Sequence, residues 1–197
     1  MQDVLQGRPA LLLIDIQQGF DEKEYYGGER NNPQAEQRAQ ELLAYWRQHQ
    51  LPLFHIQYSS LNALSPLRPQ HTGFAFKKEV APLPGEPVLV RSVNSAFINT
   101  DLQARLEEQK IDTVIVIGFS TEHCVSTTTR MAGNLGYHTF IISDATAAFN
   151  KTGVNGQRFD AELVHQLTLA TLQDEFATVL TTAELLHRMA APVTAGN

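Results

Sequence analysis

The sequence predicts an α/β fold, with a six-stranded parallel sheet between two layers of helices in a three-layer α-β-α arrangement. Strand-like and helix-like segments alternate along the 197 residues. Most of the strand-like segments are apolar throughout rather than at every second position, which is typical of strands covered on both faces of a parallel sheet. The length suits one domain, which we expect to span residues 1–197.

Six short apolar segments predict the strands of this sheet. The fourth segment, TVIVIGF, gives the clearest pattern because β-branched and aromatic residues favour strands. The predicted strands lie at residues 10–16, 52–58, 88–90, 113–119, 138–143 and 176–180.

Apolar residues at helical spacing predict helices between the strands. Asn32 and Pro33 predict the start of the first helix, as an N-cap followed by proline in the first turn. Gly136 predicts the end of the third helix, and Thr181 with Glu184 fits a capping box at the start of the last. The predicted helices cover residues 33–46, 100–109, 121–135 and 159–173, with a fifth from residue 181.

Composition and charge argue against several classes of function. Acidic residues outnumber basic ones by 21 to 15, giving a net charge of −6, which does not suit a nucleic-acid-binding protein. No apolar run approaches the roughly 20 residues of a membrane helix, and the N-terminal segment does not resemble a signal peptide. The single cysteine, Cys124, allows no internal disulfide. We therefore expect a cytoplasmic protein that acts on a small molecule and has no nucleic-acid or membrane partner.

Three chemically active residues follow predicted strands. Asp15 closes the first strand, Arg91 follows the third, and Cys124 lies in the first helical turns after the fourth. In parallel sheets, ligands bind beyond the carboxyl ends of the strands. Each residue alone has an ordinary explanation, as a turn residue, a surface cation and a small buried side chain. Together they predict a thiol nucleophile, a carboxylate that takes its proton and a cation that favours the charged forms.

The position of Cys124 also gives an expectation about its pKa. The dipole and the free N–H groups at a helix N-terminus lower the pKa of a thiol. We therefore expect the pKa of Cys124 to lie below its usual range. The same N–H groups could hold an oxyanion.

Five short motifs occur in order between residues 9 and 186. They are DIQQGF at 15–20, SAF at 95–97 with TDL at 100–102, GFSTEHCV at 118–125, GY at 136–137 and DA at 144–145. Each motif is weak alone, but in this order they resemble the isochorismatase-like cysteine hydrolases. That family includes nicotinamidases and N-carbamoylsarcosine amidases.

This resemblance implies a triad of cysteine, aspartate and lysine on a six-stranded parallel sheet. Cys124 would be the nucleophile and Asp15 the general base. The oxyanion hole would consist of the backbone N–H groups of Cys124 and Ser120. A non-proline cis peptide would join Phe119 to Ser120, with Thr121 helping to restrain it. Because family members commonly form dimers or tetramers, we expect a homodimer or homotetramer.

Substrate contacts are expected from the same motifs. Phe20, Phe97 and Phe119 would form an apolar, planar slot, and Gln17 would contact the substrate beside them. Specificity is expected to depend on the long loops at residues 59–87 and 144–157, where the resemblance is weakest.

The sequence departs from the family pattern at the lysine. Arg91 stands there, and it keeps the positive charge but cannot shuttle a proton because a guanidinium group does not lose its proton in proteins. The Asp-x-His pair of nicotinamidases is also missing, since no aspartate precedes His55. We therefore expect no metal and no cofactor.

The sequence thus predicts a metal-independent cysteine hydrolase that cleaves a carbon–nitrogen bond of a small amide through a thioester. Two alternatives remain open. One is vinyl-ether hydrolysis of the isochorismatase type, which needs no thiol nucleophile. The other is a ligand-binding or thiol-redox protein on a former hydrolase scaffold, an alternative that Arg91 keeps open.

Overall fold

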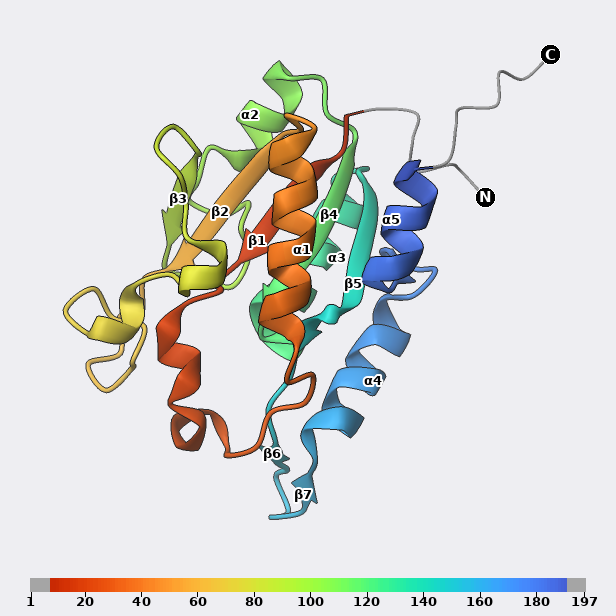
Figure 1. Ribbon diagram of the computed structural model, residues 1–197. Coiled ribbons are helices and arrows are strands. Elements are labelled where there is room, and N and C mark those ends of the chain that lie inside the picture. The colour runs from red at the N-terminus through yellow and green to blue at the C-terminus, as the bar shows by residue number, and fades with distance from the viewer. Residues whose placement is uncertain (1–7, 191–197) are drawn as a thin grey trace.

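A six-stranded sheet forms the centre of the molecule, with strand order β3-β2-β1-β4-β5-β8 and every neighbouring pair parallel (Figure 1). The computed structural model describes residues 8–190, so the predicted domain of residues 1–197 extends past the described residues at both ends. The predicted fold class is confirmed. The strands are β1 (Ala10–Ile14), β2 (Leu53–Tyr58), β3 (Val88–Arg91), β4 (Thr113–Phe119), β5 (His138–Ala147) and β8 (Thr178–Leu180).

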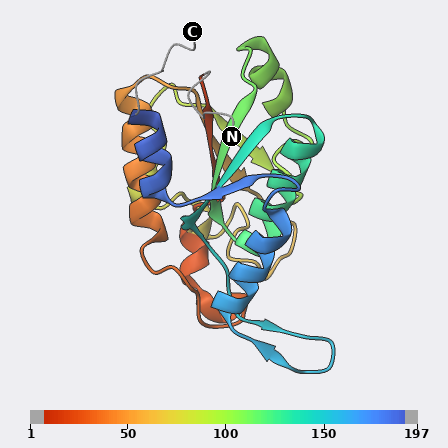
Figure 2. The ribbon, with the colours of Figure 1, turned by 90° about the vertical axis from the view of Figure 1, so that its right-hand side faces the viewer.

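Helices cover both faces of this sheet. Figure 2 shows α1 and α5 on one face, and α2, α3 and α4 on the other. None of the helices among residues 8–190 is both long and apolar enough to cross a membrane. The helices are α1 (Ala35–Gln48), α2 (Leu102–Glu108), α3 (Ser126–Asn134), α4 (Ala161–Leu172) and α5 (Thr182–Ala190).

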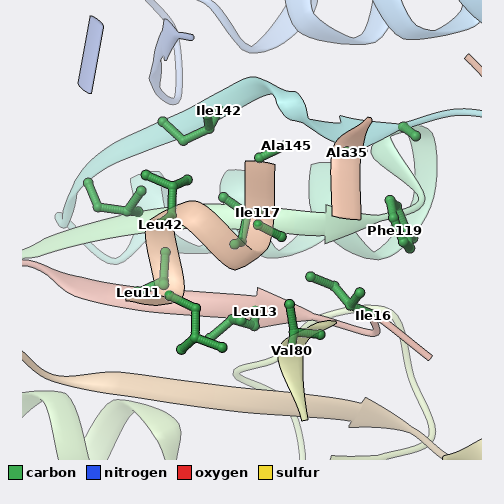
Figure 3. Packing of buried hydrophobic residues seen from close by; sticks show 14 of the residues in the cluster. Leu11, Leu13, Ile16, Ala35, Leu42, Val80, Ile117, Phe119, Ile142 and Ala145 are labelled. Carbon is green, nitrogen blue, oxygen red and sulfur yellow. The ribbon is translucent and has the colours of Figure 1, made fainter. Parts of the chain in front are cut away.

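The central strands are apolar on both faces because each face meets its own helical layer. Leu11 and Leu13 of β1 pack into the cluster that α1 covers, beside Leu42 (Figure 3). Leu12 and Ile14 point the other way, into the cluster covered by α2, α3 and α4. The continuous apolar pattern of the predicted strands therefore has the expected physical cause.

The start of the first helix differs from the prediction. Asn32 does not cap α1, which begins at Ala35. The Asn32 Nδ2 group instead donates to the carbonyls of Ser143 and Thr146, at 2.8 and 2.7 Å. The side chain thus joins the entry of α1 to β5, which continues to Ala147 through the first residues of the predicted loop.

Two other end signals act as predicted. Thr181 and Glu184 form the capping box, in which the Thr181 N–H donates to Glu184 Oε2 at 2.8 Å and the Glu184 N–H donates to Thr181 Oγ1 at 3.2 Å. Gly136 follows α3 with a φ of +88°.

Gly118 allows β4 to approach β1 closely. Its φ is +121°, and a Cβ atom there would lie 1.9 Å from the carbonyl oxygen of Ile14. Gly136 also has a positive φ, but a Cβ atom there would meet no other atom within 4 Å. Glycine at position 118 is therefore required both for its φ angle and for the missing Cβ atom, whereas glycine at position 136 is required only for its φ angle.

Gly118→Ala is expected to lower the free energy of unfolding by more than about 3 kcal/mol, because a backbone clash adds to the unfavourable dihedral angle. The matched variant Gly136→Ala is expected to lose only about 1–2 kcal/mol, from the left-handed conformation alone. Urea denaturation followed by circular dichroism measures both. Equal losses in the two variants would contradict the steric explanation.

Candidate active site

Asp15 and Arg91 meet at the carboxyl ends of the sheet. Asp15 directly follows β1 with a φ of +51°, and its N–H donates to the carbonyl of Ile56 on β2 at 3.0 Å. Arg91 is the last residue of β3, on the other side of β2. Its Nη2 donates to Asp15 Oδ2 at 2.8 Å, and neither side chain is exposed to solvent. The two residues form a fully buried ion pair.

Cys124 reaches the same place from β4. After β4 ends at Phe119, a π-helical turn at Thr121–Val125 precedes α3. The N–H of Val125 donates to the carbonyl of Ser120 at 3.3 Å, five residues back. The helix predicted at residues 121–135 is therefore correct in place, but its first turn is π rather than α. Such turns are frequent at functional sites, and here the turn holds a thiol that is only 8% exposed.

The three side chains shift one another's pKa values. Burial raises the pKa of Asp15, while Arg91 and the adjacent Cys124 thiol act against that rise. Burial and the charge of Asp15 raise the pKa of Cys124 well above its usual range, with Arg91 opposing them. Burial works to lower the pKa of Arg91, but the charges of Asp15 and Cys124 and the hydrogen bonds to them together raise it above its usual range.

The expected direction of the Cys124 pKa shift is therefore wrong. A thiol at a helix start was expected to have a lowered pKa, but this thiol is buried beside a carboxylate, and both effects disfavour the thiolate. A neutral thiol becomes a nucleophile only when a neighbouring base takes its proton. Asp15 is placed to be that base.

Several polar atoms around the thiol are buried without a hydrogen-bond partner among residues 8–190. They are Asp15 Oδ1 and the Nε and Nη1 atoms of Arg91. Buried polar groups in proteins are nearly always paired, so a group of unpaired ones needs an explanation. Next to the Cys124 thiol, these atoms could supply one acceptor and several donors for a bound ligand.

No sequence pattern predicts two further neighbours of the site, Asn94 and Tyr58. The Cys124 thiol donates to Asn94 Oδ1 at 3.8 Å, and the carbonyl of Asn94 accepts from Thr128 Oγ1 on α3 at 3.5 Å. The Tyr58 ring lies 5.1 Å from the guanidinium carbon of Arg91. Asn94 occupies an irregular loop and Tyr58 resembles any strand aromatic residue, so only the tertiary structure identifies them.

A buried network holds the turn that carries Cys124. The peptide bond between Phe119 and Ser120 is cis. The next residue, Thr121, places its Oγ1 atom 2.9 Å from Nδ1 of His165 on α4. The other ring nitrogen of His165 lies 3.4 Å from Asn32 Nδ2. The side chains of α4 and of the α1 entry thus fix the start of the π turn.

The side-chain amide of Gln17 is hydrogen-bonded to backbone groups of the protein. Its Nε2 donates to the carbonyls of Tyr58 and Phe74 at 3.2 and 2.8 Å, and its Oε1 accepts from the N–H of Tyr58 at 2.8 Å. The amide therefore fastens the 59–87 loop to the end of β2. Contact between Gln17 and a substrate stays a prediction.

The three phenylalanines predicted to line a slot are largely packed against protein groups. Phe20 meets Phe119 edge to face, with ring centroids 5.7 Å apart, and Phe119 is fully buried. Phe97 stacks on Tyr137 at 5.8 Å on the opposite face of the sheet. The structure thus separates Phe97 from the other two, and their contact with a substrate also stays a prediction.

His55 lies apart from this site. It is buried in β2, and its Nε2 atom lies 2.9 Å from Glu86 Oε2. Within residues 8–190, no three or more His, Cys, Asp or Glu side chains are grouped so that they could hold a metal ion.

Comparison with known proteins identifies the family. The isochorismatase domain model matches residues 9–184. This chain belongs to the isochorismatase family. An uncharacterised isochorismatase family protein of Bacillus subtilis, YrdC, is 44% identical over 93% of this chain and 97% of its own length. A solved isochorismatase-family structure from Chromobacterium violaceum has 43% identity and a TM-score of 0.88, covering 92% of this chain and 93% of that one.

A relative named for an amidase activity matches over a shorter stretch. Nicotinamidase 3 of Arabidopsis thaliana is 37% identical over 92 residues, which is 47% of this chain and 41% of that protein. The chain is therefore an isochorismatase-family hydrolase.

Substitutions at the ion pair test the electrostatic coupling in this hydrolase. In Asp15→Asn, the charge that raises the pKa of Cys124 is removed while Arg91 remains, so the thiol pKa is expected to fall and iodoacetamide to alkylate Cys124 severalfold faster at pH 7. In Arg91→Met, the opposing cation is lost, so the thiol pKa is expected to rise and alkylation to slow.

Mass spectrometry across a pH series measures both rates. Because breaking a buried ion pair lowers stability by about 3–5 kcal/mol, circular dichroism must first show that each variant is folded. Alkylation profiles that match the parent protein in both folded variants would contradict the coupling.

Proposed function

We propose that this protein is a metal-independent cysteine hydrolase that cleaves the carbon–nitrogen bond of a small amide through a thioester on Cys124. The observation that carries the proposal is the thiol beside a buried carboxylate that Arg91 holds in place. The relative named nicotinamidase 3 supports an amide as the substrate class.

Proton transfer to Asp15 begins the reaction. Arg91 donates to Oδ2 of the carboxylate, so Oδ1 remains free to accept the proton of the thiol. Burial raises the pKa of Asp15, which suits a group that must hold a proton briefly and then return it. As the proton moves, Sγ of Cys124 attacks the amide carbonyl and forms a tetrahedral oxyanion, to which the backbone N–H groups of Ser120 and Cys124 donate.

Collapse of this intermediate breaks the carbon–nitrogen bond. Protonated Asp15 gives its proton to the leaving nitrogen, so ammonia or an amine departs and a thioester remains. Water then attacks the thioester while Asp15 again accepts a proton. The second collapse releases the carboxylic acid, and Cys124 Sγ recovers its proton from Asp15.

The pKa of Cys124 bears on the thiol-redox alternative. Redox-sensing cysteines are exposed and have lowered pKa values. Cys124 is buried, and its pKa is raised. These properties favour a nucleophile that is activated only when its base accepts a proton.

Cys124→Ala is expected to abolish amide hydrolysis because it removes the nucleophile. A panel of small primary amides, assayed by ammonia release, measures turnover. In the parent protein, mass spectrometry after rapid acid quenching is expected to find the acyl adduct on the peptide that contains Cys124. Undiminished amide hydrolysis by Cys124→Ala would contradict the proposal.

Arg91→Lys tests whether the cation acts through its charge. Because the charge is kept and Arg91 makes one hydrogen bond to Asp15, kcat/KM is expected to change by less than about tenfold, whereas Arg91→Met is expected to lose at least about a hundredfold. Steady-state kinetics on the best amide of the panel compares the two. A large gain in kcat/KM in Arg91→Lys would instead show that arginine supports the reaction less well than lysine.

A further inference from the structure

Asn94 brings a side-chain amide into contact with the sulfur of Cys124. The thiol donates to Asn94 Oδ1 at 3.8 Å, and S–H is only a weak donor. Asn94 belongs to the irregular segment after β3 and is exposed to solvent, whereas Cys124 is only 8% exposed. The amide of Asn94 therefore connects a nearly buried thiol with the surface of the protein.

Thr128 fixes the backbone that carries Asn94. It lies on α3, four residues after Cys124, and is fully buried. Its Oγ1 atom accepts from the N–H of Ala96 at 3.1 Å and donates to the carbonyl of Asn94 at 3.5 Å. The helix that follows the nucleophile therefore also holds the segment with Asn94, so the amide is fixed beside the sulfur.

Proton transfer leaves the oxygen of Asn94 without its donor. In the proposed reaction the thiol proton goes to Asp15, so the S–H group no longer donates to Asn94 Oδ1, and that oxygen then faces a sulfur with developing negative charge. An acceptor in this position is unfavourable until another donor reaches it. The amide nitrogen of the substrate is bonded to the carbon that the sulfur attacks, so its N–H groups are the donors that arrive there.

We propose that Asn94 Oδ1 accepts a hydrogen bond from an N–H group of the leaving nitrogen and thereby favours amides over esters. The nitrogen keeps its lone pair in the tetrahedral intermediate, and this contact leaves the lone pair free to accept the proton from Asp15 as the carbon–nitrogen bond breaks. An ester has an oxygen in this place and offers no hydrogen to Asn94. The inference rests on the proposed function for the attack by Cys124, and it makes Asn94 a residue that determines the leaving group.

Amides and methyl esters of the same acids test the proposal. The probes are benzamide with methyl benzoate, and butanamide with methyl butanoate, and kcat/KM is measured for the parent protein and for Asn94→Ala. Asn99→Gly is the matched control, because Asn99 is an exposed asparagine five positions later whose φ of +59° suits glycine. Circular dichroism shows whether each variant is folded.

Asn94→Ala is expected to lower kcat/KM for the amides about three- to tenfold, the range of one neutral hydrogen bond. The value for the esters is expected to change by less than about twofold, since the weak S–H contact is given up with either substrate. Asn99→Gly is expected to keep the parent values for both.

Binding gives the same comparison without turnover. Calorimetry measures the Kd of each probe for Cys124→Ala and for Cys124→Ala with Asn94→Ala. The second substitution is expected to weaken binding of the amides about three- to tenfold and to leave the Kd of the esters within about twofold.

Equal losses of kcat/KM on amides and esters would overturn the proposal, because Asn94 would then act on the sulfur rather than on the leaving nitrogen. Parent-like amide values in Asn94→Ala, or an equal loss in Asn99→Gly, would overturn it as well. The proposed function fails separately, if the parent protein and Cys124→Ala hydrolyse amides equally well. The Kd values then decide the role of Asn94, and unchanged amide binding or no amide binding counts against it.

Discussion

The buried ion pair between Asp15 and Arg91 is the interaction on which the site depends. A buried charge without a partner lowers stability by several kcal/mol, so each member of the pair requires the other. The contact joins only Nη2 to Oδ2 and is covered by the Tyr58 ring. The contact that stabilises the buried carboxylate therefore leaves its second oxygen, Oδ1, without a hydrogen bond within residues 8–190.

The topology of the sheet brings these groups to one edge. In the order β3-β2-β1-β4, the carboxyl ends of β3, β1 and β4 lie at the same edge of the sheet, with β2 between β3 and β1, so Arg91, Asp15 and the turn after β4 come together there. Gly118 permits the close approach of β4 to Ile14 at the end of β1, where a Cβ atom would collide with the backbone. From the other side, Thr121 is held through its hydrogen bond to His165. Rigid elements thus fix each member of the group.

The sequence was sufficient for the sheet, for both helical layers and for the meeting of Asp15, Arg91 and Cys124, because apolar periodicity locates the strands and parallel strands have their carboxyl ends at one edge of the sheet. The sequence-based predictions were wrong at two positions where a local pattern competed with tertiary contacts. Asn32 resembles an N-cap but bonds to β5, and the helix start at Cys124 suggested a lowered pKa that burial and Asp15 reverse. Asn94 is recognisable only once the chain is folded.

In the proposed mechanism, arginine can take the place of the lysine that the resemblance implies, because the proton moves through the aspartate. With Oδ1 of Asp15 free, the cation is required only to stabilise negative charge, and a group that never loses its proton does so at any pH. Arg91 also keeps two donors, Nε and Nη1, buried and unpaired. Each such group is unfavourable by about 1–3 kcal/mol until it finds a partner. In the proposed reaction, negative charge that develops beside Arg91 would therefore be stabilised more strongly than the neutral ground state. Such a difference is the condition for catalysis by differential binding.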